Sequence, residues 1–169
     1  RRRYATLERM AYRVAEGKLP ALIVSGPPGL GKSYTVEQVL EEVKGPAVPH
    51  SADEDIEEEE EEEDQHDGSR LDLHLEDIPP YDVISGTITA VGLYIALYKQ
   101  REGGIVVLDD CDDVFRDETC LNILKAVLDS SDVRRVSYRK KAYWMEEMGI
   151  PDHFEFSGSI VFCTNVDFE

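Results

Sequence analysis

The stretch IVSGPPGLGKSYTV, residues 23–36, decides how the rest of the chain is interpreted. A short apolar run leads into a segment of Gly and Pro, and a pattern typical of a helix follows. Such a segment is either a backbone cradle for phosphate or a plain turn between a strand and a helix. The flanking elements, and the residues that follow the other predicted strands, distinguish between these two possibilities.

Residues 26–33, GPPGLGKS, match the pattern G-x-x-x-x-G-K-[ST] of nucleotide-binding loops. The glycines allow backbone conformations that turn N–H groups inward, and the following helix adds its own N–H groups and partial positive charge. Lys32 is predicted to reach the β- and γ-phosphates, and the Ser33 hydroxyl to bind Mg²⁺. The predicted phosphate-binding residues are Gly26, Pro27, Pro28, Gly29, Leu30, Gly31, Lys32, Ser33 and Tyr34. The strand-like and helical flanks favour the cradle over the turn.

The apolar residues predict an alternating series of helices and strands. Helical spacing indicates helices over 4–16, 32–44, 87–100 and 117–128, and short apolar runs indicate strands over 21–25, 81–85, 105–108 and 159–163. This alternation predicts an α/β fold with a parallel sheet covered by helices on both faces. Ligands of such sheets bind beyond the carboxyl ends of the strands.

Polar residues follow two further predicted strands at that edge. Asp109 and Asp110 come directly after the run 105–108, and Asn165 follows the run 159–163. Asp109 is expected to hold Mg²⁺ through water, and Asp110 to polarise the attacking water. Asn165 either orients this water against the γ-phosphate or is an ordinary turn residue. For Asp110 the alternative is that the acids after the strand cap the next helix.

Acidity is concentrated in one segment of the chain. Twelve acidic residues and no basic one lie between residues 53 and 67, and without them the net charge changes from −18 to −6. Residues 46–80 are therefore predicted to form an acidic, disordered insertion, either a solvated loop or a segment that binds a protein partner. Three cysteines without CxxC spacing favour a reduced, cytoplasmic protein, and no apolar run is long enough to span a membrane.

Residues 133–157 have a mixed pattern that predicts a hairpin-like insertion before the last strand. A basic cluster with interleaved aromatic residues lies within it. Such clusters bind single-stranded nucleic acid through phosphate contacts and stacking, but a solvated hairpin that pairs with acidic residues is the alternative. The candidate nucleic-acid residues are Arg134, Arg135, Tyr138, Arg139, Lys140 and Lys141.

Together these motifs resemble the AAA+ ATPase family, and its phage-encoded members most of all. GPPGLGKS at 26–33 is similar to the family's Walker A motif, IVVLDD at 105–110 to Walker B, and VFCTN at 161–165 to the sensor 1 strand. The resemblance covers nearly the whole chain, so residues 1–169 are expected to form the family's large ATPase subdomain. It implies a three-layer fold with strand order 5-1-4-3-2, binding of ATP with Mg²⁺, and assembly into rings, with hexamers the expected form.

The chain departs from the family pattern in two ways. Walker B usually ends in Asp-Glu, whereas this chain has Asp109-Asp110, and the shorter side chain is expected to slow hydrolysis. The arginine finger and the sensor 2 arginine usually lie beyond the sensor 1 strand, so we expect the chain to be a fragment. With the basic cluster at 134–141, we expect a DNA motor, a helicase, or a helicase or clamp loader that acts on single- or double-stranded DNA in the cytoplasm, that of the host if phage-encoded. A nucleotide-gated assembly factor is the alternative, and a P-loop small-molecule kinase is less favoured.

Overall fold

The computed structural model describes residues 2–47, 78–131, 133–140 and 142–166. Its centre is a parallel sheet of β1 (Ala21–Ser25), β2 (Tyr81–Ser85), β3 (Ile105–Asp109) and β6 (Ser159–Thr164), in the order β1-β6-β3-β2. The predicted α/β class and all four predicted strands are therefore confirmed. This order corresponds to the 1-4-3-2 part of the expected order. The described residues contain no fifth strand beside β1, so that part stays a prediction.

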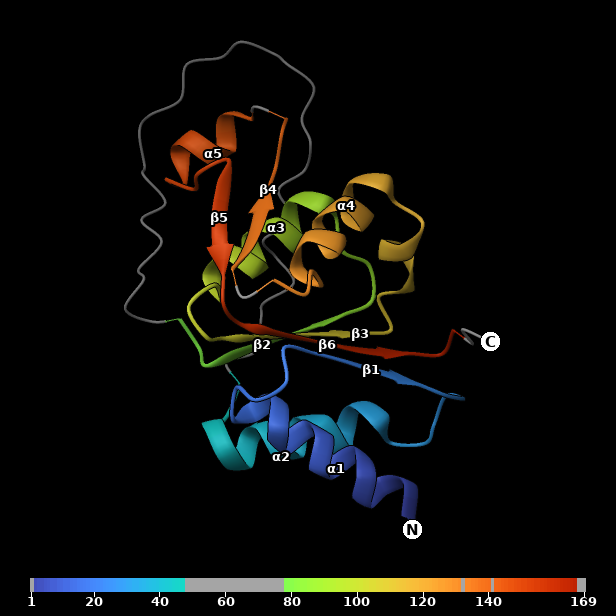
Figure 1. The fold of residues 1–169 in the computed structure, drawn as a ribbon. Coiled ribbons are helices and arrows are strands. Elements are labelled where there is room, and N and C mark those ends of the chain that lie inside the picture. Colours follow the sequence, from blue (N-terminus) through green and yellow to red (C-terminus); the bar gives the residue numbers. More distant parts are fainter. Residues whose placement is uncertain (1, 48–77, 132, 141, 167–169) are drawn as a thin grey trace.

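Helices cover both faces of the sheet, which gives three layers (Figure 1). On one face lie α1 (Arg2–Ala15) and α2 (Lys32–Lys44), and on the other lie α3 (Ala90–Lys99) and α4 (Glu118–Val127). β1, β2 and β3 each precede a helix that crosses back over the sheet, as right-handed parallel connections require. The loop 26–31 therefore joins the carboxyl end of β1 directly to the first turn of α2.

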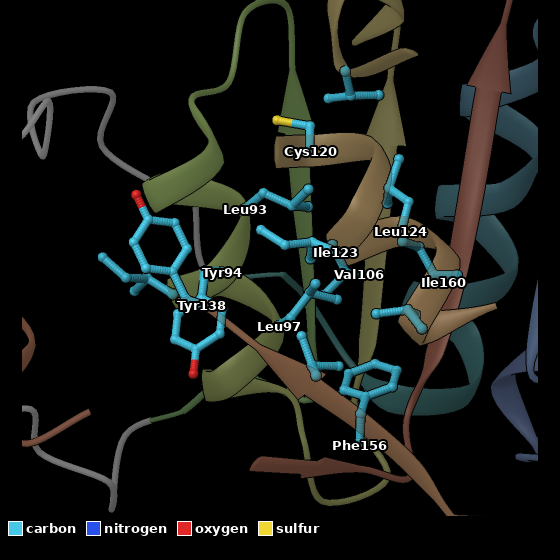
Figure 2. Packing of buried hydrophobic residues seen from close by; sticks show 14 of the residues in the cluster. Leu93, Tyr94, Leu97, Val106, Cys120, Ile123, Leu124, Tyr138, Phe156 and Ile160 are labelled. Atoms are coloured by element: carbon cyan, nitrogen blue, oxygen red, sulfur yellow. The ribbon is translucent and has the colours of Figure 1, made fainter. Parts of the chain in front are cut away.

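The middle residues of the central strands β3 and β6 are apolar because both faces of these strands are buried. Ile105 and Val107 of β3 face the α1–α2 layer, whereas Val106 and Leu108 face the α3–α4 layer. Figure 2 shows the larger cluster, in which Leu93 and Leu97 of α3 and Ile123 and Leu124 of α4 gather above the sheet. This packing fixes the strand ends at which the polar residues lie.

The acids after β3 belong to two short local structures. Asp112 begins the 3-10 helix η2 (Asp112–Phe115), which the sequence patterns did not predict. Asp117 is the N-cap of α4, and its carboxylate accepts the Cys120 N–H at 2.7 Å. Helix α3 begins at Ala90, later than predicted, because Thr89 caps it by accepting the Gly92 N–H. Asp117 is thus the acid that caps the following helix, and Asp109 and Asp110 are not.

The predicted insertion is an antiparallel strand pair with a short helix between the strands. β4 (Arg134–Ser137) pairs with β5 (His153–Phe156), and α5 (Tyr143–Glu147) lies between them. The pair packs on the outer side of α3 and α4 (Figure 1). Tyr94 of α3 anchors it, because its hydroxyl donates to Pro151 O at 2.5 Å and its ring lies 5.1 Å from that of Phe154.

The acidic segment 53–67, proposed as a protein-binding or solvated loop, lies outside the described residues. Only residues 46–47 and 78–80 of the predicted insertion 46–80 are described. The division of the chain into a large subdomain with two insertions therefore stays a prediction.

Candidate nucleotide-binding site

The loop between β1 and α2 has the backbone shape of an anion cradle. Gly29 and Gly31 have φ angles of 76° and 72°, in the left-handed region that favours glycine. Gly31 is also the N-cap residue of α2, and no side chain caps this helix end. The N–H groups of the first turn of α2 therefore have no capping side chain as partner, and they suit an anion.

Lys32 and Ser33 contact the polar residues that follow the other strands. The Lys32 ammonium donates to Gly26 O at 2.8 Å, to Pro27 O at 2.9 Å and to Asn165 Oδ1 at 2.9 Å. The Ser33 hydroxyl donates to the Asp109 carboxylate. The first turn of α2 thus meets the ends of β3 and β6, as the pattern of polar strand ends predicted.

Asn165 links Lys32 to Asp110. Its amide Nδ2 donates to Asp110 Oδ1 at 2.8 Å while its Oδ1 accepts from Lys32, so the amide has a partner at both ends. Asp110 has φ 53° and is the only non-glycine residue with a positive φ in the described part of the chain. Residues held in this region gather at functional sites, where the surrounding structure must compensate the strain.

The Ser33–Asp109 pair supplies the kind of ligands that Mg²⁺ prefers. A hydroxyl and a carboxylate oxygen are hard ligands, and Mg²⁺ takes its remaining ligands from phosphates and water. No cluster of three metal-ligating side chains exists among the described residues. The site residues therefore fit Mg²⁺.

Two groups beside this pair, the half-buried Glu37 and the buried Cys163, have raised pKa values. Burial, and secondarily the Asp109 carboxylate, raise the pKa of Glu37, which lies one helical turn after Ser33. Burial raises the pKa of the Cys163 thiol to about 12, and the Asp109 charge adds to this shift. The sequence patterns missed both residues. The i, i+4 spacing from Ser33 was the signal that could have placed Glu37 at this face of α2.

A groove of about 560 Å³ lies between α1 and α2. Tyr34, which is 68% exposed, lines it together with Glu8 and Tyr12 of α1. The Tyr4 hydroxyl donates to Leu30 O at 2.5 Å, so α1 also contacts the loop itself. The sequence patterns assigned α1 no part in the site.

The candidate nucleic-acid residues divide between the interior and the surface. Arg134 is 7% exposed, and its guanidinium donates to Val127 O at 3.1 Å and to Gly158 O at 2.6 Å. Tyr138 is 6% exposed and packs against Tyr94 (Figure 2). In this structure both residues are buried by packing within the domain. The sequence pattern predicted that Arg134 and Tyr138 bind nucleic acid at the surface, because a basic cluster does not indicate which of its residues are buried.

The other candidates are exposed or lie outside the described residues. Arg135, Arg139 and Lys140 are exposed. The register of the strand pair places Glu155 opposite Arg135, so the outer face of the pair carries both signs of charge. Lys141 is not described. The exposed basic surface is therefore smaller than the sequence indicated.

The family that the motifs suggested is found by comparison with known proteins. The profile of the family described as "ATPase family associated with various cellular activities (AAA)" matches residues 22–138, which include the phosphate loop and β3. The chain belongs to the AAA ATPase family. The predicted resemblance and the P-loop α/β fold are confirmed.

One relative of this AAA domain is an uncharacterized 36.7 kDa protein of the nrdC–mobD intergenic region of Enterobacteria phage T4. The two are 33% identical over 168 residues, which is 99% of this chain and 42% of the relative. The AAA domain thus spans well under half the length of that protein, whose phage origin agrees with the predicted likeness to phage members. No solved structure matches the chain significantly. Among the described helices of the AAA domain, none is long and apolar enough to cross a membrane.

Proposed function

We propose that this AAA domain hydrolyses ATP with Mg²⁺ at the edge formed by the loop 26–33 and the ends of β3 and β6. The observation that carries the proposal is the chain of contacts from Lys32 through Asn165 to Asp110, beside the Ser33–Asp109 pair. These contacts bring a phosphate-binding cation, an orienting amide and a carboxylate base together at one place. Family membership supports the ATPase class of this activity.

Each residue has a role that follows from its chemistry. The loop N–H groups and Lys32 hold the phosphates, and Ser33 with Asp109 holds Mg²⁺. Bound Mg²⁺ neutralises the charge that develops on the β- and γ-phosphate oxygens. Asp110 accepts a proton from the attacking water, and Asn165 orients that water. Tyr34, exposed beside the groove, is the residue we assign to contact with the base.

Asp110 is also the reason to expect slow turnover. Asp is one methylene shorter than Glu, so its carboxylate reaches less far toward the γ-phosphate. Its left-handed backbone turns the side chain toward Asn165. The expected kcat is therefore roughly 1 per second or below, at or under the low end of the range of about 1 to 100 per second that is typical of kinases.

The test uses two variants of the full-length protein. Asp110→Asn keeps the hydrogen-bonding shape but not the base, so ATP affinity should stay within about threefold while turnover falls by about a hundredfold or more. Lys32→Ala should abolish nucleotide binding, since the cation that neutralises the phosphates is lost. ATP affinity that survives Lys32→Ala would overturn the proposed site. Turnover that survives Asp110→Asn would remove Asp110 from the role of base.

We further propose that the domain works in a homo-oligomeric ring, a hexamer in its expected form, in the cytoplasm of a host cell. We propose single-stranded DNA as the molecule on which the ring acts. Because Arg134 and Tyr138 are buried, this proposal is supported by the exposed residues Arg135, Arg139 and Lys140. A nucleotide-gated assembly factor is the second candidate, favoured by the mixed charge on the outer face of β4 and β5.

Stimulation of ATP hydrolysis by single-stranded DNA separates the two candidates. The triple variant Arg135→Ala/Arg139→Ala/Lys140→Ala should lose the stimulation but keep the basal rate, because phosphate contacts are removed far from Lys32. Lys18→Ala, an exposed lysine paired with Glu16, is the matched control and should keep the stimulation. A wild-type rate that DNA does not change would rule out the DNA-driven function and leave the assembly factor.

A further inference from the structure

The end of β6 carries a second polar contact beside that of Asn165. The Thr164 hydroxyl donates to Asp112 Oδ1 at 2.5 Å, while its oxygen accepts the Val166 N–H at 3.0 Å. Thr164 is 1% exposed, so its hydroxyl has no access to solvent as an alternative partner. Asp112 is the first residue of η2, which has no side-chain cap.

This contact lies at the end of the sheet. Thr164 is the last residue of β6 and pairs with Ser25 of β1, and Asn165 follows it outside the strand. A side-chain contact is added at each of the two neighbours of Asn165. Thr164 is tied to Asp112, and Val166 O accepts the Ser25 hydroxyl at 2.5 Å. The Asn165 amide thus lies between two fixed neighbours, Val166, which is bound to Ser25 of β1, and Thr164, which is bound to Asp112 after β3.

Asp110 makes two further contacts between the turn after β3 and the end of β6. The Asp110 N–H donates to Cys163 O at 2.9 Å, and its carboxylate accepts from Asn165. Residues 163–165 therefore contact Asp110 and Asp112 at three successive positions. The left-handed φ of Asp110 turns the chain between these contacts, and such a conformation persists only where its surroundings over-determine it.

We propose that Asp112 and Thr164 are positioning residues for hydrolysis. Their hydrogen bond sets the register between the turn after β3 and the end of β6, and so holds the Asn165 amide between Lys32 and Asp110. Neither residue touches the nucleotide in this role. The inference rests on the proposed function, because it assigns a role in the turnover carried out by Asp110 and Asn165.

Substitutions of Thr164 in the full-length protein test the hydrogen bond. Thr164→Val keeps the shape but removes the hydroxyl. We expect kcat to fall by about ten- to a hundredfold, the effect of an unmade buried hydrogen bond, while KM for ATP changes by less than about threefold. Thr164→Ser, which keeps the hydroxyl, should restore most of kcat. Thr164→Val with wild-type kcat, or with KM affected as much as kcat, would overturn the inference.

Substitutions of Asp112 separate hydrogen bonding from charge. Asp112→Asn still offers an oxygen to Thr164, so it should lose much less kcat than Asp112→Ala. The double variant Thr164→Val/Asp112→Ala should be no slower than the slower single variant, because both remove the same contact. Equal losses for Asn and Ala, or additive effects in the double variant, would contradict a positioning role.

The activity of the wild-type protein separates a failure of this inference from a failure of the proposed function. If the wild-type protein turns over ATP and Thr164→Val is unaffected, the inference alone fails. If the wild-type protein with Mg²⁺ does not turn over ATP, the proposed function fails, and the inference fails with it.

Discussion

At the scale of single residues, neighbours in the sequence have unlike roles. Arg134 and Arg135 are adjacent on β4, but successive side chains of a strand point to opposite faces. Arg134 lies inside, where its cation stabilises the carbonyl end of α4 at Val127, and its Cζ atom lies 5.1 Å from the Phe156 ring centroid. Burial lowers the pKa of Arg134, yet a guanidinium keeps its charge at neutral pH. Arg134 therefore holds the strand pair to the core.

This assignment predicts unequal effects on stability. Arg134→Met should lower the free energy of unfolding by about 2–4 kcal/mol, because two buried carbonyls lose a charged donor. Arg135→Met is the matched control on the exposed face and should change it by less than about 0.5 kcal/mol. Urea unfolding of both variants measures the difference. Equal effects would show that Arg134 does not anchor the insertion.

At the scale of elements, caps decide where the helices begin. Asp117 and Thr89 accept N–H groups from the first turns of α4 and α3. The bonds that Asp117 accepts from Cys120 lower the pKa of its carboxyl. Since this folded-state pKa lies below the unfolded value, the contribution of the charged cap is present above about pH 4 and is lost as the pH falls. The stabilisation of the start of α4 by the Asp117 cap therefore depends on pH.

Substitution of the cap makes this coupling measurable. Asp117→Ala should lower the free energy of unfolding by about 1 kcal/mol at pH 7, and Asp117→Asn by less, because Asn also caps. The advantage of Asp over Asn should shrink toward pH ~2, where the carboxylate is protonated. Unfolding curves at both pH values measure it, with Glu147→Gln as an exposed control. An advantage that does not depend on pH would contradict a charged cap.

At the scale of the whole molecule, the site joins segments that are far apart in the sequence. The parallel register places Ser25 beside Thr164 and Asp109 beside Cys163, so one nucleotide would touch elements from both halves of the domain. A ligand that binds only the assembled sheet stabilises the entire folded state. Nucleotide binding is therefore expected to raise the melting temperature of the domain as a unit.

The size of this shift can be estimated. ATP with Mg²⁺ at a hundred times its Kd contributes about 2.7 kcal/mol, which corresponds to a rise in Tm of roughly 5–10 °C for a domain of this size. Lys32→Ala should remove the shift, whereas Asp110→Asn should keep it. Thermal unfolding at several ATP concentrations provides the measurement. A shift of equal size in Lys32→Ala would show that the nucleotide binds elsewhere.

The sequence by itself determined the class of fold and predicted the centre of the candidate site. Regular apolar periodicity sufficed for the α/β pattern, because strands buried on both faces must be apolar throughout. The spacing of GPPGLGKS sufficed for the phosphate loop, because few residue types allow that backbone. Asp109, Asp110 and Asn165 followed from a general rule, that the carboxyl ends of parallel strands meet at one edge.

Only the tertiary structure decided the rest, because contacts between distant segments leave no local pattern. Arg134 and Tyr138 are buried and do not belong to the basic surface, although the basic cluster 134–141 is continuous in the sequence. The register between β3 and β6 paired Thr164 with Asp112 across 52 residues. A helical turn placed Glu37 beside Asp109. Each of these depends on which faces meet when the sheet closes, and the spacing of residues along one segment does not contain that information.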